Sequence, residues 1–406
     1  MITFPNDFLW GAATSSHQVE GSATANDWWQ WEQSGGTGQV SGDACRHFEL
    51  FRHDFDIAKD LNHNAHRFSI EWSRVNPSPG IFSTQAIAHY KDVVLSLKER
   101  GIEPVVTLHH FTNPLWFLRM GGWSRRRNID FFLRYADVIV QALAKDVRFW
   151  VTVNEPVVYA YQSYLNGWWP PQHTSLRESL AVMENFKAAH IKTYRLIHGI
   201  YRGANAVPPT VTFAHNMIHF SACTRRLRDR LAVWLRDTSY NFRFLDDMIG
   251  AGCLDAVGLN YYTRNLVDTQ GWSLKELFTQ CCRRGHDTLP KNDMGWEDYA
   301  QGLYELLMRL GRYRKPVIIL ENGTCVADDS RRWAFIAGHL RSVHAARTHG
   351  VDVQGYLYWS LLDNFEWDKG FNRRFGLVEV DFTTQRRTVR QSARQFAEVC
   401  KTGLLI

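Results

Sequence analysis

Short runs of apolar residues alternate with segments of helical periodicity along the whole chain. The runs predict buried strands: FLWGAA near residue 8, then 66–72, 104–108, 149–153, 210–214, 254–259, 316–320 and 353–358. Helical spacing predicts one helix from Phe48, Phe51, Phe55, Ala58 and Leu61, and another from Phe131, Tyr135, Val138 and Ala142.

This alternation predicts the fold class. Strand–helix–strand order within one domain implies parallel strands, and eight of them close into a barrel. We therefore predict an α/β protein in which residues 1–406 form a single-domain (β/α)8 TIM barrel. A doubly wound open sheet is the competing fold, but it usually shows a glycine-rich phosphate turn after an early strand, and the sequence has none.

Polar and ionisable residues follow most of the predicted strands at once. They are Glu71, His109 and His110, Asn154 and Glu155, Asn260 to Tyr262, Glu321 and Asn322, and Trp359 to Asp363. Barrel enzymes place their chemistry at the C-terminal ends of the strands. One such residue is often a helix cap or a loop start, whereas six strand ends of the same character indicate an active site.

The composition favours a folded, globular protein. Of 406 residues, 45% are hydrophobic and 22% are charged, so the chain can form a large core. No apolar run approaches the roughly 20 residues that span a bilayer, and the start of the chain lacks the pattern of a signal peptide. The net charge of +6 is scattered in short runs such as Arg125 to Arg127, Arg225 and Arg226, and Arg386 and Arg387, which are typical of solvated faces. We expect a cytoplasmic protein without a nucleic-acid or membrane partner, and the oligomeric state stays open.

The seven cysteines show neither a disulfide framework nor a metal-binding pattern. Only Cys281 and Cys282 are neighbours, and neither C-x-x-C nor H-E-x-x-H occurs. We therefore expect reduced thiols, no metal and no cofactor. The 16 tryptophans are unusual, and their flat apolar rings suit both a protein core and the C–H faces of sugars.

Two glutamates are the candidate catalytic groups. Glu155 in FWVTVNEP and Glu321 in VIILENG each follow a β-branched strand directly. An ionisable side chain that leaves a buried strand costs desolvation unless it is paired or used. A single glutamate of this kind is usually a structural ion pair or a cap. Acid–base cleavage of an acetal requires at least two carboxyl groups that face one cavity.

The motifs FLWGAATSSHQVEG, HRFSIEWSR, TVNEP, GLNYYT, ENG and WSLLDNFEW carry a resemblance to a known family. Their order and approximate spacing resemble those of family 1 glycoside hydrolases, from about Phe4 to about Ala397. The resemblance implies a retaining β-glycosidase that hydrolyses terminal nonreducing β-D-glucosyl residues of a small β-glycoside or oligosaccharide, with some β-galactoside or β-fucoside activity.

The resemblance also implies roles for individual residues. Glu155 becomes the general acid/base and Glu321 the nucleophile, with Arg67 and Tyr262 holding the nucleophile anionic and Asn154 binding the sugar 2-hydroxyl. The residues implied to bind the nonreducing sugar are Gln18, His110, Phe111, Asn260, Trp359, Glu366, Trp367 and Phe375. Trp168 and Trp169 are assigned to the aglycone side. His109 is expected to point into the barrel wall because neighbouring residues of a strand face opposite sides.

The sequence departs from the family pattern at three places. Phe111 stands where the family commonly has tryptophan, so an indole N–H donor is missing. The stretch between Glu155 and Tyr262 and the loop after Glu321 look short, which would open the leaving-group side of the pocket. Cys325 follows ENGT and receives no role.

Three other functions remain as alternatives. A 6-phospho-β-glucosidase would carry Ser and Lys near Glu366 to bind phosphate, and a carboxylate there would repel it. A thioglucosidase of the plant type lacks the acid/base glutamate that this chain has. A non-catalytic sugar-binding barrel usually loses one catalytic carboxylate, and convergence of Glu155 and Glu321 on one pocket separates it from an enzyme.

Overall fold

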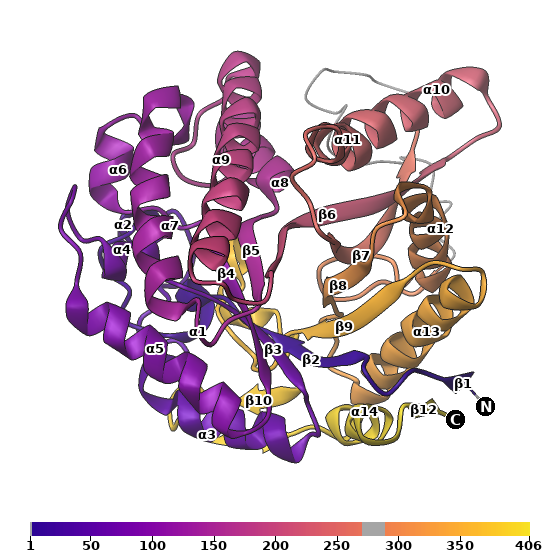
Figure 1. Ribbon diagram of the computed structural model, residues 1–406. Helices are drawn as coiled ribbons and strands as arrows, with labels where there is room; N and C mark the ends of the chain where they lie inside the picture. Colours follow the sequence, from indigo (N-terminus) through magenta and orange to yellow (C-terminus); the bar gives the residue numbers. More distant parts are fainter. Residues whose placement is uncertain (1, 270–288) are drawn as a thin grey trace.

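The computed structural model describes residues 2–269 and 289–406. Eight parallel strands form a closed barrel in chain order (Figure 1), and the last strand pairs with the first. The strands are β2 (Leu9–Ala13), β3 (Ala65–Ser69), β4 (Glu103–His109), β5 (Phe149–Asn154), β6 (Thr210–Ala222), β7 (Val257–Val267), β8 (Val317–Asn322) and β9 (Val353–Trp359). The predicted (β/α)8 barrel is confirmed.

Helices surround the barrel on its outside (Figure 1). The α-helices are α1 (Ser16–Val19), α2 (Asp27–Gln33), α3 (His47–Asp60), α4 (Trp72–Val75), α5 (Thr84–Glu99), α6 (Leu115–Arg119), α7 (Ile129–Leu143), α8 (Pro156–Ala160), α9 (Leu176–Gly203), α10 (Leu227–Arg236), α11 (Arg243–Gly250), α12 (Ala300–Leu310), α13 (Asp329–Thr348) and α14 (Gln391–Thr402).

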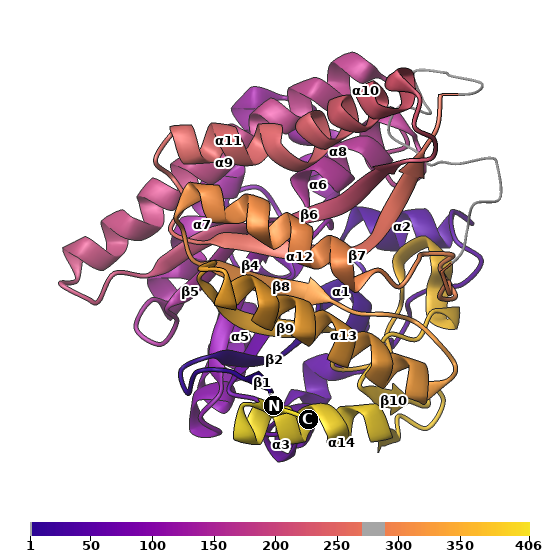
Figure 2. The same ribbon diagram turned by 90° about the vertical axis from the view of Figure 1, so that its right-hand side faces the viewer.

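Two small antiparallel pairs lie outside the barrel. The first joins β1 (Ile2–Thr3) to β12 (Leu404–Leu405), so the two ends of the described chain lie side by side (Figure 2). The second joins β10 (Val378–Val380) to β11 (Arg387–Val389). This second pair follows the loop after β9, which carries part of the predicted sugar pocket.

The core has an inner and an outer layer. A cluster that includes Val105, Val151, Ile318 and Leu357 comes from the strands and fills the barrel. A larger apolar cluster lies between the strands and the helices. Because the barrel is filled with side chains, open space for a ligand lies at the ends of the strands.

All eight strands occur where the apolar runs predict them, but β6 and β7 are much longer than expected. The predicted runs end at residues 214 and 259, whereas the two strands continue to Ala222 and Val267 and pair with each other along this extension. Many residues of the extension are only half-buried. The side chains of the extension therefore include both polar and apolar types. The continuous apolar pattern that predicts a barrel strand ends before the extension begins.

The predicted helix over residues 131–142 is confirmed as α7, but its buried face is different. Tyr135 is buried as expected, whereas Phe131, Val138 and Ala142 are only half-buried. The helix instead buries a face that includes Phe132 and Ile139. The sequence IDFFLRYADVIVQAL is apolar on most sides, so its spacing predicts a helix without selecting the inward face.

The expectation of reduced thiols holds only in part. Cys45, Cys253, Cys325 and Cys400 are free, but Cys223 is disulfide-bonded. A disulfide depends on the distance between two residues in space, which spacing along the sequence does not reveal. Cys281 and Cys282 lie outside the described residues.

Candidate active site

A cavity of about 840 Å³ opens at the C-terminal ends of the strands. It brings together most of the residues that the sequence analysis selected. Its lining includes His110, Phe111, Asn154, Glu155, Trp168, Trp169, Tyr262, Glu321, Trp359, Glu366, Trp367 and Phe375. Three selected residues, Gln18, Arg67 and Asn260, are almost fully buried and lie behind this lining.

Glu155 leaves the end of β5 in an unusual backbone conformation. Its φ of 43° and ψ of 57° lie in the left-handed region, which residues other than glycine rarely adopt. The Glu155 amide donates to the carbonyl of Ala214 on the neighbouring strand at 2.8 Å, and Pro156 begins α8 directly afterwards. Such strain is retained where surrounding structure enforces it, and it is concentrated at functional sites.

Glu321 lies at the end of β8 and is held by two donors. The Arg67 guanidinium donates to Oε1, and the Tyr262 hydroxyl donates to Oε2. Gly323 allows this strand end to approach β9, because a Cβ at this position would lie 1.9 Å from the carbonyl oxygen of Trp359. The glycine of ENG is thus required by the close contact between the two strand ends.

Arg67 connects several of these groups from inside the barrel. Besides Glu321, it donates to Thr107 Oγ1 at 3.0 Å and to Asn154 Oδ1 at 2.7 Å. Its side chain is 1% exposed, so the charge is compensated mainly by the buried carboxylate of Glu321. The rigid guanidinium fixes the position of that carboxylate and of the Asn154 amide together.

Glu155 is held by amides instead of a cation. Asn260 Nδ2 donates to Oε1 of Glu155 at 2.8 Å, and Asn216 Nδ2 donates to the same oxygen at 3.1 Å. The hydroxyl of Tyr240 donates to Oδ1 of Asn216 at 2.9 Å, which directs the NH2 group of Asn216 towards Glu155. Asn260 was selected as a sugar-binding residue, but here it lies behind Glu155 and supports it.

Sequence reasoning missed Asn216 and Tyr240, although both line the cavity. Asn216 lies beside Asn260 in the register of β6 and β7, so it occupies the same kind of polar strand end as Asn154 and Asn260. A search for polar residues at the ends of the predicted strands could therefore have identified Asn216. Tyr240 belongs to a π-helical segment, Asp237–Phe242, and gives no comparable signal in the sequence.

The two carboxyl groups have different environments. Burial and then the nearby Glu321 carboxylate raise the pKa of Glu155 to about 8, against the opposing effect of the Asn260 and Asn216 amides. Burial also raises the pKa of Glu321, but the Arg67 charge and the Tyr262 hydroxyl oppose this increase. Because, among the residues that the structure describes, a cation contacts Glu321 directly and none contacts Glu155, we assign the negative charge of the pair to Glu321 and the proton to Glu155.

Glu366 is a third carboxyl group in the lining of the cavity. Gln18 Nε2 donates to its Oε2 at 3.2 Å and to the Phe365 carbonyl at 3.0 Å. Burial and then the Glu321 charge raise the pKa of Glu366 to about 8, whereas hydrogen bonds from Trp359 and Gln18 oppose the increase. Donors from a sugar would stabilise its ionised form.

Aromatic rings form the walls around Glu366. The His110 ring is nearly parallel to the Trp359 and Trp367 rings, with centroids 5.9 Å apart in both pairs. Burial, followed by the Arg67 charge, holds the pKa of His110 well below its usual value, so the imidazole is neutral. His109 instead packs against Trp123 and Phe186 and does not line the cavity, as expected.

The remaining selected aromatics differ in exposure. Phe111 is buried, has a φ of 68°, and contacts Trp169 and Trp367 with ring centroids 5.1 Å away in each case. Trp169 is therefore part of the aromatic wall near Trp367, whereas Trp168 is 55% exposed at the cavity mouth. Phe375 is buried against Tyr262 and Trp296.

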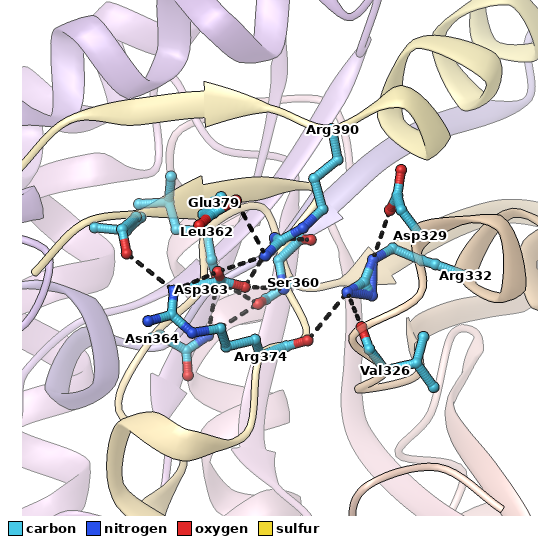
Figure 3. Close-up of polar contacts among 12 residues, drawn as sticks. Val326, Asp329, Arg332, Ser360, Leu362, Asp363, Asn364, Arg374, Glu379 and Arg390 are labelled. Atoms are coloured by element: carbon cyan, nitrogen blue, oxygen red, sulfur yellow. Dashed lines mark hydrogen bonds and ion pairs between the residues drawn. The ribbon is translucent and has the colours of Figure 1, made fainter.

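The loop that carries Glu366 is fixed by a buried carboxylate on its outer side. Figure 3 shows Arg390 and Arg374 converging on Asp363. Arg390 donates to both carboxylate oxygens, at 3.0 Å and 2.8 Å, and Arg374 donates to Oδ2 at 3.2 Å. Asn364 donates to the Ser360 hydroxyl at 2.8 Å. Asp363 thus positions the loop and does not face the cavity.

Residues of the β6 and β7 extension form the outer part of the cavity. Met217 and Ile218 line it on β6, and Arg264 and Leu266 line it on β7. They lie on the open side of the site beyond Glu155 and Tyr262. The sequence analysis did not select them, because it ended both strands too early.

The described residues contain no group of three or more His, Cys, Asp or Glu side chains that could hold a metal ion. None of the helices in the described ranges is long and apolar enough to cross a bilayer.

Comparison with known proteins gives consistent matches. A family model described as glycosyl hydrolase family 1 matches residues 1–252 and 221–404. The chain is 30% identical over 450 residues to beta-glucosidase A of Acetivibrio thermocellus, with 99% of each chain covered.

Two solved structures have the same fold. The beta-glycosidase from Pyrococcus horikoshii matches with a TM-score of 0.89 and 38% identity over 99% of this chain and 96% of that chain. The beta-glucosidase from Thermotoga maritima in complex with deoxynojirimycin matches with a TM-score of 0.92 and 29% identity over 100% of both chains.

Proposed function

The chain belongs to glycosyl hydrolase family 1 and is a glycoside hydrolase, and we propose that it hydrolyses terminal β-D-glucosyl residues with retention, with Glu321 as nucleophile and Glu155 as general acid/base. The observation that carries the proposal is the unequal support of two carboxyl groups in one cavity. Glu321 contacts Arg67 and Tyr262, whereas Glu155 accepts only from amides. One group is set to act as an anion and the other as an acid.

In the first step, Glu321 attacks the anomeric carbon and the bond to the leaving group breaks. Glu155 transfers its proton to the departing oxygen, and the sugar becomes covalently attached to Glu321. Attack uses a carboxylate oxygen that Arg67 or Tyr262 has already oriented. The positive charge that develops on the sugar ring is stabilised by the anionic nucleophile beside it.

In the second step, water replaces the leaving group. Once Glu321 carries the sugar, its negative charge is gone, and the pKa of Glu155 falls because repulsion between the two groups has ended. Glu155 then removes a proton from water, which attacks the anomeric carbon and releases Glu321. The configuration at that carbon is inverted twice and therefore retained.

Glu366 and the aromatic residues around it supply sugar recognition. Glu366 offers an acceptor next to the Trp359 ring, and the buried Gln18 carboxamide supports it from behind the lining, which suits the equatorial hydroxyls and apolar C–H face of a glucoside. We propose unphosphorylated β-glucosides as the main substrates, with β-galactosides and β-fucosides as secondary ones. We further propose a cytoplasmic site of action, as the sequence analysis expects.

Trapping of the covalent intermediate tests the catalytic assignment. An activated 2-deoxy-2-fluoro-β-glucoside slows the second step, so the sugar should remain on the protein and mass spectrometry of peptides should locate it on Glu321. The Glu155→Gln variant should still be labelled, because a good leaving group needs little protonation. The matched Glu321→Gln variant should stay unlabelled. A label on another residue would overturn the assignment.

A further inference from the structure

The solvent-facing side of α10 (Leu227–Arg236) is apolar, which is unusual for a surface helix. Leu227 is 78% exposed, Leu231 53%, Trp234 58% and Leu235 38%. At about 100° per residue, these four side chains fall within an arc of about 100° on the helix surface. They form one continuous stripe, which we call the α10 stripe.

The opposite side of α10 holds the helix to the protein. Asp229, Ala232 and Arg236 are buried, and α10 packs against β6. Asp229 accepts from the backbone N–H of Thr269 at 3.1 Å and from its hydroxyl at 2.6 Å. The helix is therefore anchored by its polar inner face, and its apolar side points away from the core, which inverts the usual pattern of a surface helix.

Arginines surround the α10 stripe. Arg225 and Arg226 precede the first turn, and Arg228 and Arg230 lie on the two flanks of the stripe; all four are exposed. The acidic residue within the helix, Asp229, is buried. An apolar stripe with a tryptophan and cationic flanks is the arrangement by which helices lie in the headgroup region of an anionic lipid surface.

The helix α10 belongs to the outer part of the molecule. In both views the helix lies at the periphery of the molecule (Figure 1 and Figure 2). It follows β6, which also lines the cavity through Met217 and Ile218. The stripe and the cavity mouth therefore lie at the same end of the barrel.

We propose that the α10 stripe docks the protein on the surface of a bilayer that contains anionic phospholipids. The apolar side chains enter the boundary between headgroups and acyl chains, and the four arginines pair with lipid phosphates. This inference is independent of the catalytic assignment. It departs from the expectation of no membrane partner, which rested on the absence of a spanning segment.

Charge and shape disfavour two other occupants. A second copy of the chain, stripe against stripe, would bring two sets of four arginines together, and like charges across an interface are costly. Nucleic acid would be attracted by the arginines, but the leucines at the centre of the stripe offer nothing to bases or phosphates.

Cosedimentation of the full chain with lipid vesicles tests the proposal. We expect binding to vesicles of phosphatidylcholine mixed with phosphatidylglycerol and much weaker binding to vesicles of phosphatidylcholine alone. Raising the salt from about 0.1 M to about 1 M shortens the screening length from about 10 Å to about 3 Å and should release the protein. Equal binding to both vesicle types, or none to either, would overturn the proposal.

Paired variants identify the surface. The double variant Leu231→Ser/Trp234→Ser should weaken vesicle binding by about tenfold or more, because both side chains lose their apolar contact with the lipid. The control Ile81→Ser/Val207→Ser removes two residues of similar exposure, 61% and 63%, elsewhere on the molecule, and should bind like the wild type. Circular dichroism and the melting temperature check that both variants fold.

A second measurement separates lipid binding from self-association. Sedimentation equilibrium without lipid should give the same mass for the wild type and for Leu231→Ser/Trp234→Ser. A wild-type dimer that this double variant dissociates would assign the stripe to a second copy and overturn the proposal. Unchanged vesicle binding of the double variant would also overturn it.

Discussion

The Nδ2 atom of Asn216 lies 3.1 Å from Oε1 of Glu155, the same oxygen that Asn260 contacts at 2.8 Å. Both amides therefore meet one oxygen, so the proton of the neutral acid belongs on Oε2. Their donation favours the ionised form of Glu155 and limits the increase in its pKa that burial causes. Asn216 is a positioning residue whose orientation depends on Tyr240.

Removing this amide should shift the pH dependence of the enzyme. We expect Asn216→Ala to raise the pKa of Glu155 above about 8, because one hydrogen bond to the ionised form is lost. The basic limb of the kcat/KM profile should then move upward by up to about one pH unit. Tyr240→Phe should produce a smaller shift in the same direction. A downward shift in both variants would contradict the role of Asn216.

Loss of the acid/base group should affect substrates unequally. In Glu155→Ala, an aryl glucoside with a good leaving group should still form the covalent intermediate, whereas a poor leaving group should lose about 10²–10⁴-fold in rate. Added azide should restore turnover and yield a β-glucosyl azide, because it replaces the water that Glu155 would activate. Glu321→Ala, the matched control, should not give the β-azide. Equal losses for all leaving groups without rescue would exclude the acid/base role.

The buried acid should make the fold less stable as pH rises. The folded pKa of Glu155, about 8, exceeds the ordinary value of 4.5, so between these values the folded protein binds more protons than the unfolded chain. The free energy of unfolding therefore decreases as pH rises through this window.

Glu155→Gln removes this titration. The variant should unfold at a higher temperature than the wild type, with an advantage on the order of 1–3 kcal/mol that is larger at pH 8 than at pH 5. Thermal unfolding of both proteins at one scan rate measures this difference in stability. Glu99→Gln, at an exposed position on α5, is the control and should show no such trend. A stability advantage of Glu155→Gln that becomes smaller with increasing pH would contradict the expected decrease in the wild type's free energy of unfolding.

Glu366 should discriminate between neutral and phosphorylated sugars. A phosphate dianion near this carboxyl group would either meet a like charge or force the group to remain protonated, and both cost free energy. We expect kcat/KM for nitrophenyl β-glucoside to exceed that for its 6-phosphate by about a hundredfold or more, which corresponds to roughly 2.7 kcal/mol. Glu366→Ser should reduce the ratio and slow turnover of the neutral sugar. Equal use of both substrates would favour the phospho-glycosidase alternative.

The sequence predicts the barrel well because most barrel strands are apolar runs, although β3 (AHRFS) carries the buried polar residues His66 and Arg67. It does not predict where β6 and β7 end, since His219 and Arg264 pair beyond the barrel in a half-exposed extension. The polar strand ends similarly indicate Glu155 and Glu321. Tyr240 could not be found in this way, because its contact with Asn216 arises from the packing of a separate π-helical segment.

The same limit applies to Asn260. The resemblance assigns it to the sugar, whereas in the structure it is fully buried and donates to Glu155. Sequence motifs identify which residues gather at the site. They do not distinguish a residue that touches the ligand from one that supports a neighbour, because the two differ only in the direction of a side chain.

The left-handed backbone at Glu155 also bears on how such a protein evolves. A glycine at this position would adopt the observed φ of 43° without steric cost and would remove a buried acid at the same time. A glutamate in this left-handed, buried position therefore costs folding stability, and its presence is what a functional demand on the carboxyl group predicts.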